Sequence, residues 1–586
     1  MNQLKKFLNN LKYLLPAFGK YKKYSFIAIF STFFETVMEV LVPIFMAKVL
    51  DDGILKQNMS LTLTYGIIMV IISLLAMASG LMATRYTGIS SVGFGYNLRN
   101  LQYAKIQTFG FEDIEKFSTP SLITRMTGDI QQIIMSCFMI MRFLVKSPIM
   151  IIVTVIITIN VNASLSMVFF ATAPILALYV IFIAIKTIPG FTMFRSQFDN
   201  INLTVEENLA NIRLIKSLVR QKKETNKFKE ESKKMFNVGN IVFGRLSSLN
   251  AFSSFVLFLT TVLILLFGGN EIIKGRMGVG ELTGFITYSM MLLMSLIMMS
   301  NLLVQIIASS ASITRVSEVL KHETKLKDDK ASDENKVIDG SVDFENVFFK
   351  YEEDSKNYAL SGVNLHIKSG EKIGILGETG SSKSTLVQLI PRLYDVSEGK
   401  IKVSGVDVRD YKFKNLRDNV AVVLQKNVLF SGTIKENMRM GNLNATEEEI
   451  INACKIAQAH DFIMERSDGY NSILGQGGSG VSGGQKQRLC IARALLKKPK
   501  ILILDNSTSA VDTATDKKIR DGLEKFSKDM TTITISQRIN SIMNCDRIII
   551  MENGRIEDIG DHEYLMKNNE NYKKLYELQQ KGEDDE

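Results

Sequence analysis

The chain has 586 residues and a net charge of +10. Its mean hydropathy is +0.11 although 22% of the residues are charged, which excludes a uniformly soluble protein and requires that apolar residues be concentrated in one part. The basic residues flank apolar stretches in the first half, so the charge favours a membrane surface over nucleic acid as a partner.

Six apolar stretches in the first half are each long enough to cross a hydrocarbon layer of roughly 30 Å as a helix. They lie near residues 24–49, 61–83, 133–159, 164–185, 249–267 and 282–307. The connections at 86–132 and 186–248 are long and basic, whereas the other three are short and poor in Lys and Arg. The positive-inside rule therefore predicts that both termini and the two long connections are cytoplasmic.

The long connections have helical patterns and reach their tips near residues 111–115 and 206–212. We expect short transverse helices there, carrying Phe111 and Glu207, that dock on another domain. A solvated helical hairpin is the alternative.

Four charged residues lie in the interior of two expected spans. Glu35 and Glu39 are one helical turn apart on the first span, and Arg142 and Lys146 are one turn apart on the third. A charge at the bilayer centre costs at least about 2.5–3.5 kcal/mol, so these side chains either face an aqueous substrate cavity or pair between spans.

The sixth span is rich in methionine, with Met290, Met294 and Met298 on one stretch. Methionine is pliable and suits a cavity that accepts varied apolar ligands. Simple packing between helices is the alternative.

After the last span, residues 321–340 are dominated by Lys, Asp, Glu and Ser without periodicity, which predicts a linker between a membrane domain at 1–320 and a second domain at 341–586. Strand-like runs alternate with helical stretches in the second domain, which predicts a soluble α/β fold. The strands are expected at 342–349, 372–376, 420–424, 501–504, 531–535 and 547–551.

A glycine-bearing turn follows the expected strand 372–376 and opens a helix. It reads Gly377-Glu378-Thr379-Gly380-Ser381-Ser382-Lys383-Ser384-Thr385 and fits the phosphate loop Gly-x-x-x-x-Gly-Lys-Ser, except that Ser382 replaces the second glycine. Such a turn directs backbone N–H groups at a polyphosphate, with Lys383 reaching the β- and γ-phosphates and Ser384 binding Mg²⁺. Asp505, at the end of the apolar run 501–504, fits the carboxylate that orients this Mg²⁺.

A second anion cradle lies in the same domain, between the phosphate loop and Asp505. It consists of Ser482, Gly483, Gly484 and Gln485 at the start of a predicted helix. Both cradles can serve one nucleotide only if two such domains face each other, which predicts a dimer.

With these motifs, the chain resembles an ABC exporter half-transporter over nearly its whole length: a membrane all-α domain of six helices fused to an α/β P-loop NTPase domain. The run 482–485 resembles the ABC signature, Tyr351 resembles the A-loop aromatic that stacks on adenine, and Gln425 resembles the Q-loop residue that contacts Mg²⁺. Ser509 and Asp512 belong to a segment similar to the D-loop. The resemblance implies ATP and Mg²⁺ as cofactors, a metal site at Ser384, Gln425 and Asp505, and swapped coupling helices near Phe111 and Glu207.

Two further residues depart from the family. Asn506 stands where the family has the glutamate that acts as general base, and an amide cannot accept the proton. Gln537 stands where the family has the switch histidine. This combination, with an intact signature, resembles the degenerate-site subunit of heterodimeric bacterial multidrug exporters.

The expected function is therefore one half of an ATP-driven exporter in a bacterial plasma membrane, moving lipophilic compounds out of the cytoplasm by alternating access. The partner half would supply the missing glutamate and histidine, and this chain alone would be a weak ATPase. The alternatives are a nucleotide-binding regulatory or structural subunit, an exporter of lipid or peptide, and a homodimer with two impaired sites. The six spans exclude a soluble ABC protein of translation.

Overall fold

The computed structural model describes residues 9–329, 331–352, 355–506, 511–526 and 529–584. The chain forms two compact units. The first comprises Met1–Gln107 and Ser118–His322, and the second comprises Thr108–Phe117 and Glu323–Glu586. The second unit therefore takes in a short segment, Thr108–Phe117, that lies between the second and third expected spans.

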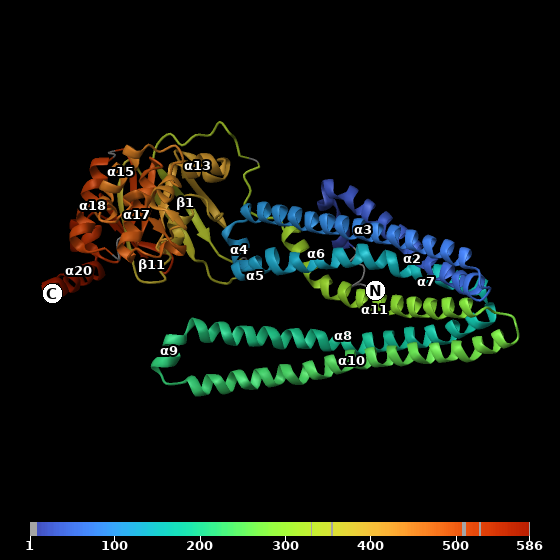
Figure 1. Ribbon diagram of the computed structural model, residues 1–586. Coiled ribbons are helices and arrows are strands. Elements are labelled where there is room, and N and C mark those ends of the chain that lie inside the picture. The colour runs from blue at the N-terminus through green and yellow to red at the C-terminus, as the bar shows by residue number, and fades with distance from the viewer. Residues whose placement is uncertain (1–8, 330, 353–354, 507–510, 527–528, 585–586) are drawn as a thin grey trace. The chain divides into compact units, whose positions relative to one another are not determined.

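Six helical stretches of the first unit are long and apolar enough to cross a membrane, which confirms the six predicted spans: Asn9–Ile54, Met59–Gln107, Thr119–Val161, Ala163–Ala210, Gln221–Ile273 and Val279–Met299. The helices are longer than a bilayer requires. At 1.5 Å per residue, the 53 residues of α10 (Gln221–Ile273) extend for about 80 Å, more than twice the thickness of the hydrocarbon layer. Figure 1 shows α8 (Ala163–Ala210) and α10 side by side, joined by the short helix α9 (Ile212–Ser217).

The other elements of the first unit are η1 (Leu15–Tyr21), α2 (Lys22–Lys48), η2 (Val49–Ile54), α3 (Met59–Gln107), α5 (Thr119–Thr124), η3 (Arg125–Asp129), α6 (Ile130–Met139), η4 (Ile140–Leu144), α7 (Val145–Val161) and α11 (Val279–Lys321). The η elements are single turns of 3₁₀ or π geometry. An apolar cluster from α8, α10 and α11 is centred on Leu176, Ile264 and Leu293, each of which is fully buried.

The second unit is an α/β structure with two main sheets. Its elements are α4 (Phe111–Phe117), β1 (Val342–Phe349), β2 (Leu360–Ile367), β3 (Lys372–Gly377), α12 (Lys383–Gln388), β4 (Glu398–Val403), β5 (Val406–Asp407), η5 (Val408–Asp410), α13 (Phe413–Asn419), β6 (Val420–Val423), β7 (Gly432–Thr433), α14 (Ile434–Arg439), α15 (Glu447–Ile456), α16 (His460–Met464), η6 (Gly469–Asn471), β8 (Ile473–Leu474), η7 (Gln476–Gly478), α17 (Gly483–Leu495), β9 (Ile501–Asp505), α18 (Thr513–Phe526), β10 (Thr531–Ile535), η8 (Ile539–Ser541), β11 (Arg547–Glu552), β12 (Arg555–Gly560), α19 (His562–Asn568) and α20 (Glu570–Asp584).

The larger sheet has the strand order β12-β11-β3-β10-β9-β6, and the smaller has the order β2-β1-β4-β5. In the larger sheet, β11, β3, β10, β9 and β6 are parallel and only β12 is antiparallel. The buried residues of β9 are all apolar except the last, as expected for a central strand covered on both faces. Every strand that the sequence predicts is present to within one residue at each end.

The segment predicted as a linker is bound to the second unit along much of its length. The carboxylate of Asp328 accepts a hydrogen bond from the backbone N–H of Phe413 at 3.0 Å. The guanidinium of Arg392 donates to the carbonyl of Lys327 at 3.0 Å. The second unit therefore includes residues from Glu323 onward, before the predicted boundary at 341.

Candidate functional site

The carboxyl ends of three adjacent parallel strands bring the predicted nucleotide residues to one edge of the sheet. Ile535 of β10 pairs with Ile375 of β3 on one side and with Asp505 of β9 on the other. The phosphate loop after β3, the Asp505–Asn506 pair after β9 and the loop after β10 therefore emerge next to one another. This edge is where open α/β sheets bind ligands.

The phosphate loop holds Lys383 tightly. Its ammonium group donates to the carbonyls of Gly377 and Glu378, at 2.8 and 2.6 Å, and to the hydroxyl of Ser381 at 3.2 Å. The side chain is buried, and this burial lowers the pKa of Lys383. Gly377 is required by close packing, because a Cβ there would lie 2.3 Å from the carbonyl oxygen of Met551.

Ser382 occupies the left-handed region of backbone space, with φ of 69° and ψ of 24°. Only glycine adopts this conformation freely, and another L-residue pays about 1–2 kcal/mol in steric energy. Its hydroxyl makes no capping hydrogen bond to α12, so no capping interaction offsets this steric energy. The serine therefore strains a turn whose geometry is still that of a phosphate loop.

The predicted metal ligands lie close together. The hydroxyl of Ser384 donates to the Asp505 carboxylate at 3.1 Å. Asp505 is 3% exposed, and burial raises the pKa of its carboxyl group. Gln425 follows β6, which pairs with β9, so it leaves the sheet at the same edge, where it is exposed. A hydroxyl, a carboxylate and an amide oxygen are hard donors of the kind Mg²⁺ prefers, so these residues fit the ion.

Tyr351 lies beside the helix that follows the phosphate loop. Its hydroxyl is 2.8 Å from that of Thr385. Its ring packs edge-on against Phe349 and Tyr394, with centroids 4.9 and 5.4 Å away. The ring is 42% exposed, which leaves surface available for stacking.

The two residues that depart from the family also lie at this edge. Asn506 has φ of 49°, a left-handed conformation that asparagine tolerates better than most residues, and its N–H donates to the carbonyl of Ile535 at 3.0 Å. Gln537 is exposed in the segment 536–541, named here the switch loop. This edge therefore carries two amide side chains at the positions where the resemblance predicts a glutamate and a histidine.

The signature residues form a separate surface. Ser482 caps α17: its hydroxyl accepts from the N–H of Gln485 at 3.3 Å, and the Gln485 side chain accepts from the N–H of Ser482 at 2.9 Å. Ser482, Gly483 and Gly484 line a concave surface of about 440 Å³ together with Arg488, Val511 and Asp512. No phosphate-loop residue lines it. Ser509 lies outside the described residues.

The four charged side chains predicted in the interior of the spans are paired with one another. Glu35 is 5% exposed and contacts both Arg142 and Lys146, with distances of 2.9 Å and 3.1 Å to their nitrogens. Lys146 also reaches Glu39 at 2.7 Å. Of the two predicted alternatives, this geometry is the ion pair between spans, here between α2, η4 and α7. On α11, Met290, Met294 and Met298 are 44%, 53% and 40% exposed.

The two predicted coupling positions differ in their surroundings. Phe111 begins the short helix α4, as expected, and its ring lies 5.9 Å from that of Tyr394. Glu207 lies within α8 and pairs with Lys227 at 3.1 Å. The prediction of a short helix over 206–212 is wrong in position, because α8 continues to Ala210 and the short helix α9 begins at Ile212. Asn211 separates the two with φ of −106° and ψ of 21°.

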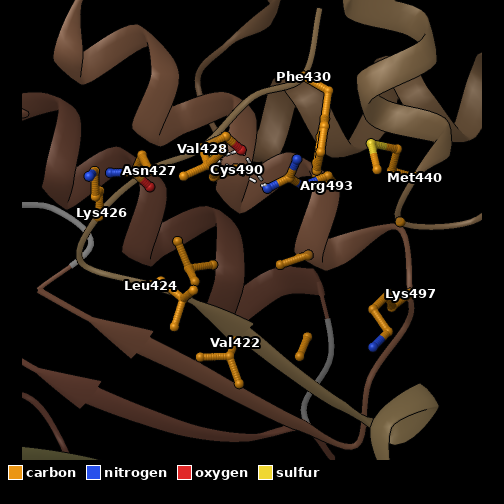
Figure 2. A pocket seen from close by; sticks show the side chains of 14 residues that line it. Val422, Leu424, Lys426, Asn427, Val428, Phe430, Met440, Cys490, Arg493 and Lys497 are labelled. Carbon is orange, nitrogen blue, oxygen red and sulfur yellow. Dashed lines mark hydrogen bonds between the residues drawn. The ribbon is translucent and has the colours of Figure 1, made fainter. Parts of the chain in front are cut away.

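A groove next to Gln425 was not predicted from the sequence. It has a volume of about 270 Å³ and is lined by exposed apolar side chains, including Leu424, Phe430 and Met440, and by the cations Lys426, Arg493 and Lys497. The guanidinium of Arg493 donates to the carbonyl of Val428 at 3.0 Å, and Figure 2 shows Phe430 close to the same guanidinium. Its residues come from 421–430, 440–441, α17 and Lys497 beyond the end of α17, so no single sequence motif marks it.

Comparison with known proteins agrees with this architecture. Residues 360–509 match the ABC transporter family, and residues 25–296 match the ABC transporter transmembrane region. The ABC transporter ATP-binding protein YfiB of Bacillus subtilis is 36% identical over 548 residues, which cover 93% of this chain and 94% of YfiB. The ATP-dependent lipid A-core flippase of Syntrophus aciditrophicus is 31% identical over 487 residues, covering 82% and 80% of the two chains. YgaD of Bacillus subtilis, whose name describes a multidrug export ATP-binding/permease protein, is 40% identical over 321 residues, or 55% of each chain. The chain therefore belongs to the ABC transporters and carries the transmembrane region and the ATP-binding domain of an exporter-type half-transporter in one polypeptide.

Proposed function

We propose that this chain is one subunit of a heterodimeric ABC exporter and that its own ATP site binds nucleotide but hydrolyses it very slowly. The observation that carries this proposal is Asn506, at the end of β9 and directly after the buried Asp505. An amide there cannot take the proton of the attacking water. Loss of a general base slows a reaction by about 10²–10⁴.

The residues that we expect to hold ATP support this proposal. Lys383 would exchange its bonds to the loop carbonyls for bonds to the β- and γ-phosphates, and Tyr351 would stack on adenine. Ser384, Asp505 and Gln425 would hold Mg²⁺, which neutralises phosphate charge when bound. Binding is therefore retained at a site whose proton-transfer groups are absent.

The signature surface gives this chain its part in the active site of a second subunit. Ser482 and Gly484 lie on a concave surface apart from the phosphate loop, so they can complete a nucleotide site only on a facing domain. The partner would carry the glutamate and histidine that Asn506 and Gln537 replace. ATP hydrolysis would then occur at the partner's phosphate loop and this chain's signature.

The groove beside Gln425 provides a docking site for a coupling helix of the partner subunit. In this chain, α9 has no buried residue, and Ile212 and Leu214 are 40% and 57% exposed, so its apolar face has the chemistry that such a groove accepts. The acidic residues Glu206 and Glu207 precede α9, and the groove carries Lys426, Arg493 and Lys497. With the swapped arrangement of exporters, the equivalent helix of the partner would bind here and transmit closure of the ATP-binding domains to the spans.

The transported compounds are lipophilic: drugs or lipids. YgaD is named for multidrug export and another relative is a lipid A-core flippase. The exposed methionines of α11 provide a pliable apolar surface for such compounds. The basic long connections support a cytoplasmic ATP-binding domain. We infer that the membrane is the bacterial plasma membrane.

The test is to purify the chain alone and in complex with a related half-transporter that has glutamate and histidine at the two positions. We expect the lone chain to bind ATP with negligible turnover, and the complex to hydrolyse ATP and to move a lipophilic dye across proteoliposomes. Vigorous turnover by the lone chain would refute the degenerate site. Turnover by the complex without any transport would favour a regulatory subunit.

A further inference from the structure

The side chain of Gln579, on the C-terminal helix α20, bonds to the backbone of the switch loop at two points. The Gln579 amide oxygen accepts a hydrogen bond from the backbone N–H of Ile539 at 2.8 Å. Its amide nitrogen donates to the backbone carbonyl of Gln537, also at 2.8 Å. Because one partner is only a donor and the other only an acceptor, just one orientation of the amide satisfies both. Gln579 therefore bridges the two sides of residue 538.

The helix that carries Gln579 is itself well anchored. Tyr572 is 1% exposed, and its hydroxyl lies 2.8 Å from the Nδ1 atom of His562. It belongs to an apolar cluster that also contains Ile539 of the switch loop and Leu376, the residue before the phosphate loop. The same packed core thus supports α20, the switch loop and the end of β3.

The switch loop has its own local bonds at Ser536, but these do not reach the Gln537 carbonyl. The Ser536 hydroxyl accepts from the N–H of Arg538 at 2.9 Å and donates to the Arg538 carbonyl at 3.1 Å. The Gln537 side chain is exposed, and it makes no hydrogen bond to the residues that the structure describes. Its direction is therefore set by the backbone on either side of it, and Gln579 holds that backbone.

We propose that Gln579 is a positioning residue of the ATP site, which fixes the switch loop so that the Gln537 side chain faces the γ-phosphate. The inference rests on the proposed role of Gln537 at the nucleotide. It makes the C-terminal helix part of the site, although α20 lies outside the residues that match the ABC transporter family.

The test is titration of the full-length chain with a fluorescent ATP analogue and Mg²⁺. Gln579→Ala removes both bonds, and Gln579→Glu keeps the acceptor while losing the donor. Because two bonds to the switch loop are lost, we expect roughly tenfold weaker binding for the alanine variant and a smaller loss for the glutamate variant. Gln580→Ala is the matched control, because the one side-chain hydrogen bond of Gln580 within the described residues, to Asn540, is weak at 3.5 Å. It should bind like the parent chain.

A double-mutant cycle separates positioning from general stabilisation. Gln537→Ala should weaken binding, and Gln579→Ala should cost no further affinity in that background. The loss of the two bonds should lower the melting temperature without nucleotide by the same amount in both backgrounds, so affinity and stability are separated. Full additivity, unchanged binding by Gln579→Ala, or an equal loss in Gln580→Ala would overturn the inference. No effect of Gln537→Ala would instead refute the proposed role of Gln537 in the site.

Discussion

Restoring a carboxylate at position 506 tests the chemistry of the site most directly. In Asn506→Glu the new side chain can accept the proton of the attacking water, and a general base contributes about 10²–10⁴ in rate, or about 3–5 kcal/mol. Position 506 has φ of 49°, however, and glutamate lacks the tolerance of asparagine for the left-handed region. That conformation costs about 1–2 kcal/mol, close to one factor of ten, so part of the gain is lost.

Gln537 limits the gain further, because it cannot supply the imidazole that the family uses at the γ-phosphate. We therefore expect Asn506→Glu to raise ATP turnover at this site by about ten- to a hundredfold, and the double variant with Gln537→His to raise it by at least about tenfold more. Phosphate release would be measured on the complex whose partner has its catalytic glutamate changed to glutamine, so that only this chain's site contributes.

The matched control is Asn506→Gln, which has the length of glutamate without its charge and should stay inactive. If the glutamine variant equals the glutamate variant, no base has been restored. If Asn506→Glu alone reaches the rate of the double variant, Gln537 does not limit the site and the reasoning about the switch loop is wrong.

Three further predictions concern the phosphate loop, the metal site and the membrane unit. Ser382→Gly should relieve about 1–2 kcal/mol of steric cost in the folded state. Glycine also stabilises the unfolded state by about 0.4–1 kcal/mol through conformational entropy, so the melting temperature should rise only slightly. Ser382→Ala keeps the strain and should show no such rise. Burial raises the pKa of Asp505 above its ordinary 3.8, so the affinity for ATP with Mg²⁺ should fall as the pH drops through the raised pKa. The contribution of this carboxyl group to folding stability should fall in the opposite direction, as the pH rises through the same window. Asp505→Asn should bind Mg²⁺ weakly and lack this pH dependence. Arg142→Ala leaves Glu35 buried with one cation fewer, so it should destabilise the membrane unit by up to about 3–5 kcal/mol in thermal unfolding. The control Lys56→Ala removes an exposed ion pair and should have no measurable effect. Equal losses in the two variants would contradict the assignment of a buried ion pair.

The spans and the central strands were predictable because each depends on a local pattern. A long apolar run in a membrane forms a helix because the helix hydrogen-bonds all the backbone N–H and C=O groups within the segment. The run 501–504 is apolar throughout because β9 is covered on both faces. The strands β2, β4 and β12 were not predicted. The strands β2 and β4 belong to the smaller sheet, and β12 lies at the edge of the larger one. Their residues are buried only alternately or in part, so their sequences mix polar and apolar residues in short stretches.

The remaining differences come from contacts between residues far apart in sequence. The charges of α2 and η4 were known to need a partner or water, but only the packing of the spans shows that Glu35 meets Arg142 across 107 positions. The start of α9 depends on one residue, Asn211, whose non-helical backbone ends α8 after Glu207. Gln579 lies 42 positions from the carbonyl that it holds, and no motif marks it.

The altered residues are confined to one step of the chemistry. In the proposed site, Lys383, Ser384 and Asp505 would bind phosphate and metal, and they lie in the phosphate loop and at the end of the neighbouring strand β9. Asn506 and Gln537 would replace the groups that act on the attacking water. If the whole site had lost its function, substitutions would be expected among the binding residues as well as at positions 506 and 537. In the proposed heterodimer, a site that keeps its binding groups and lacks its base would let ATP remain bound through many turnovers of the facing site. The two ATP-binding domains would then stay engaged on one side while hydrolysis opens the other.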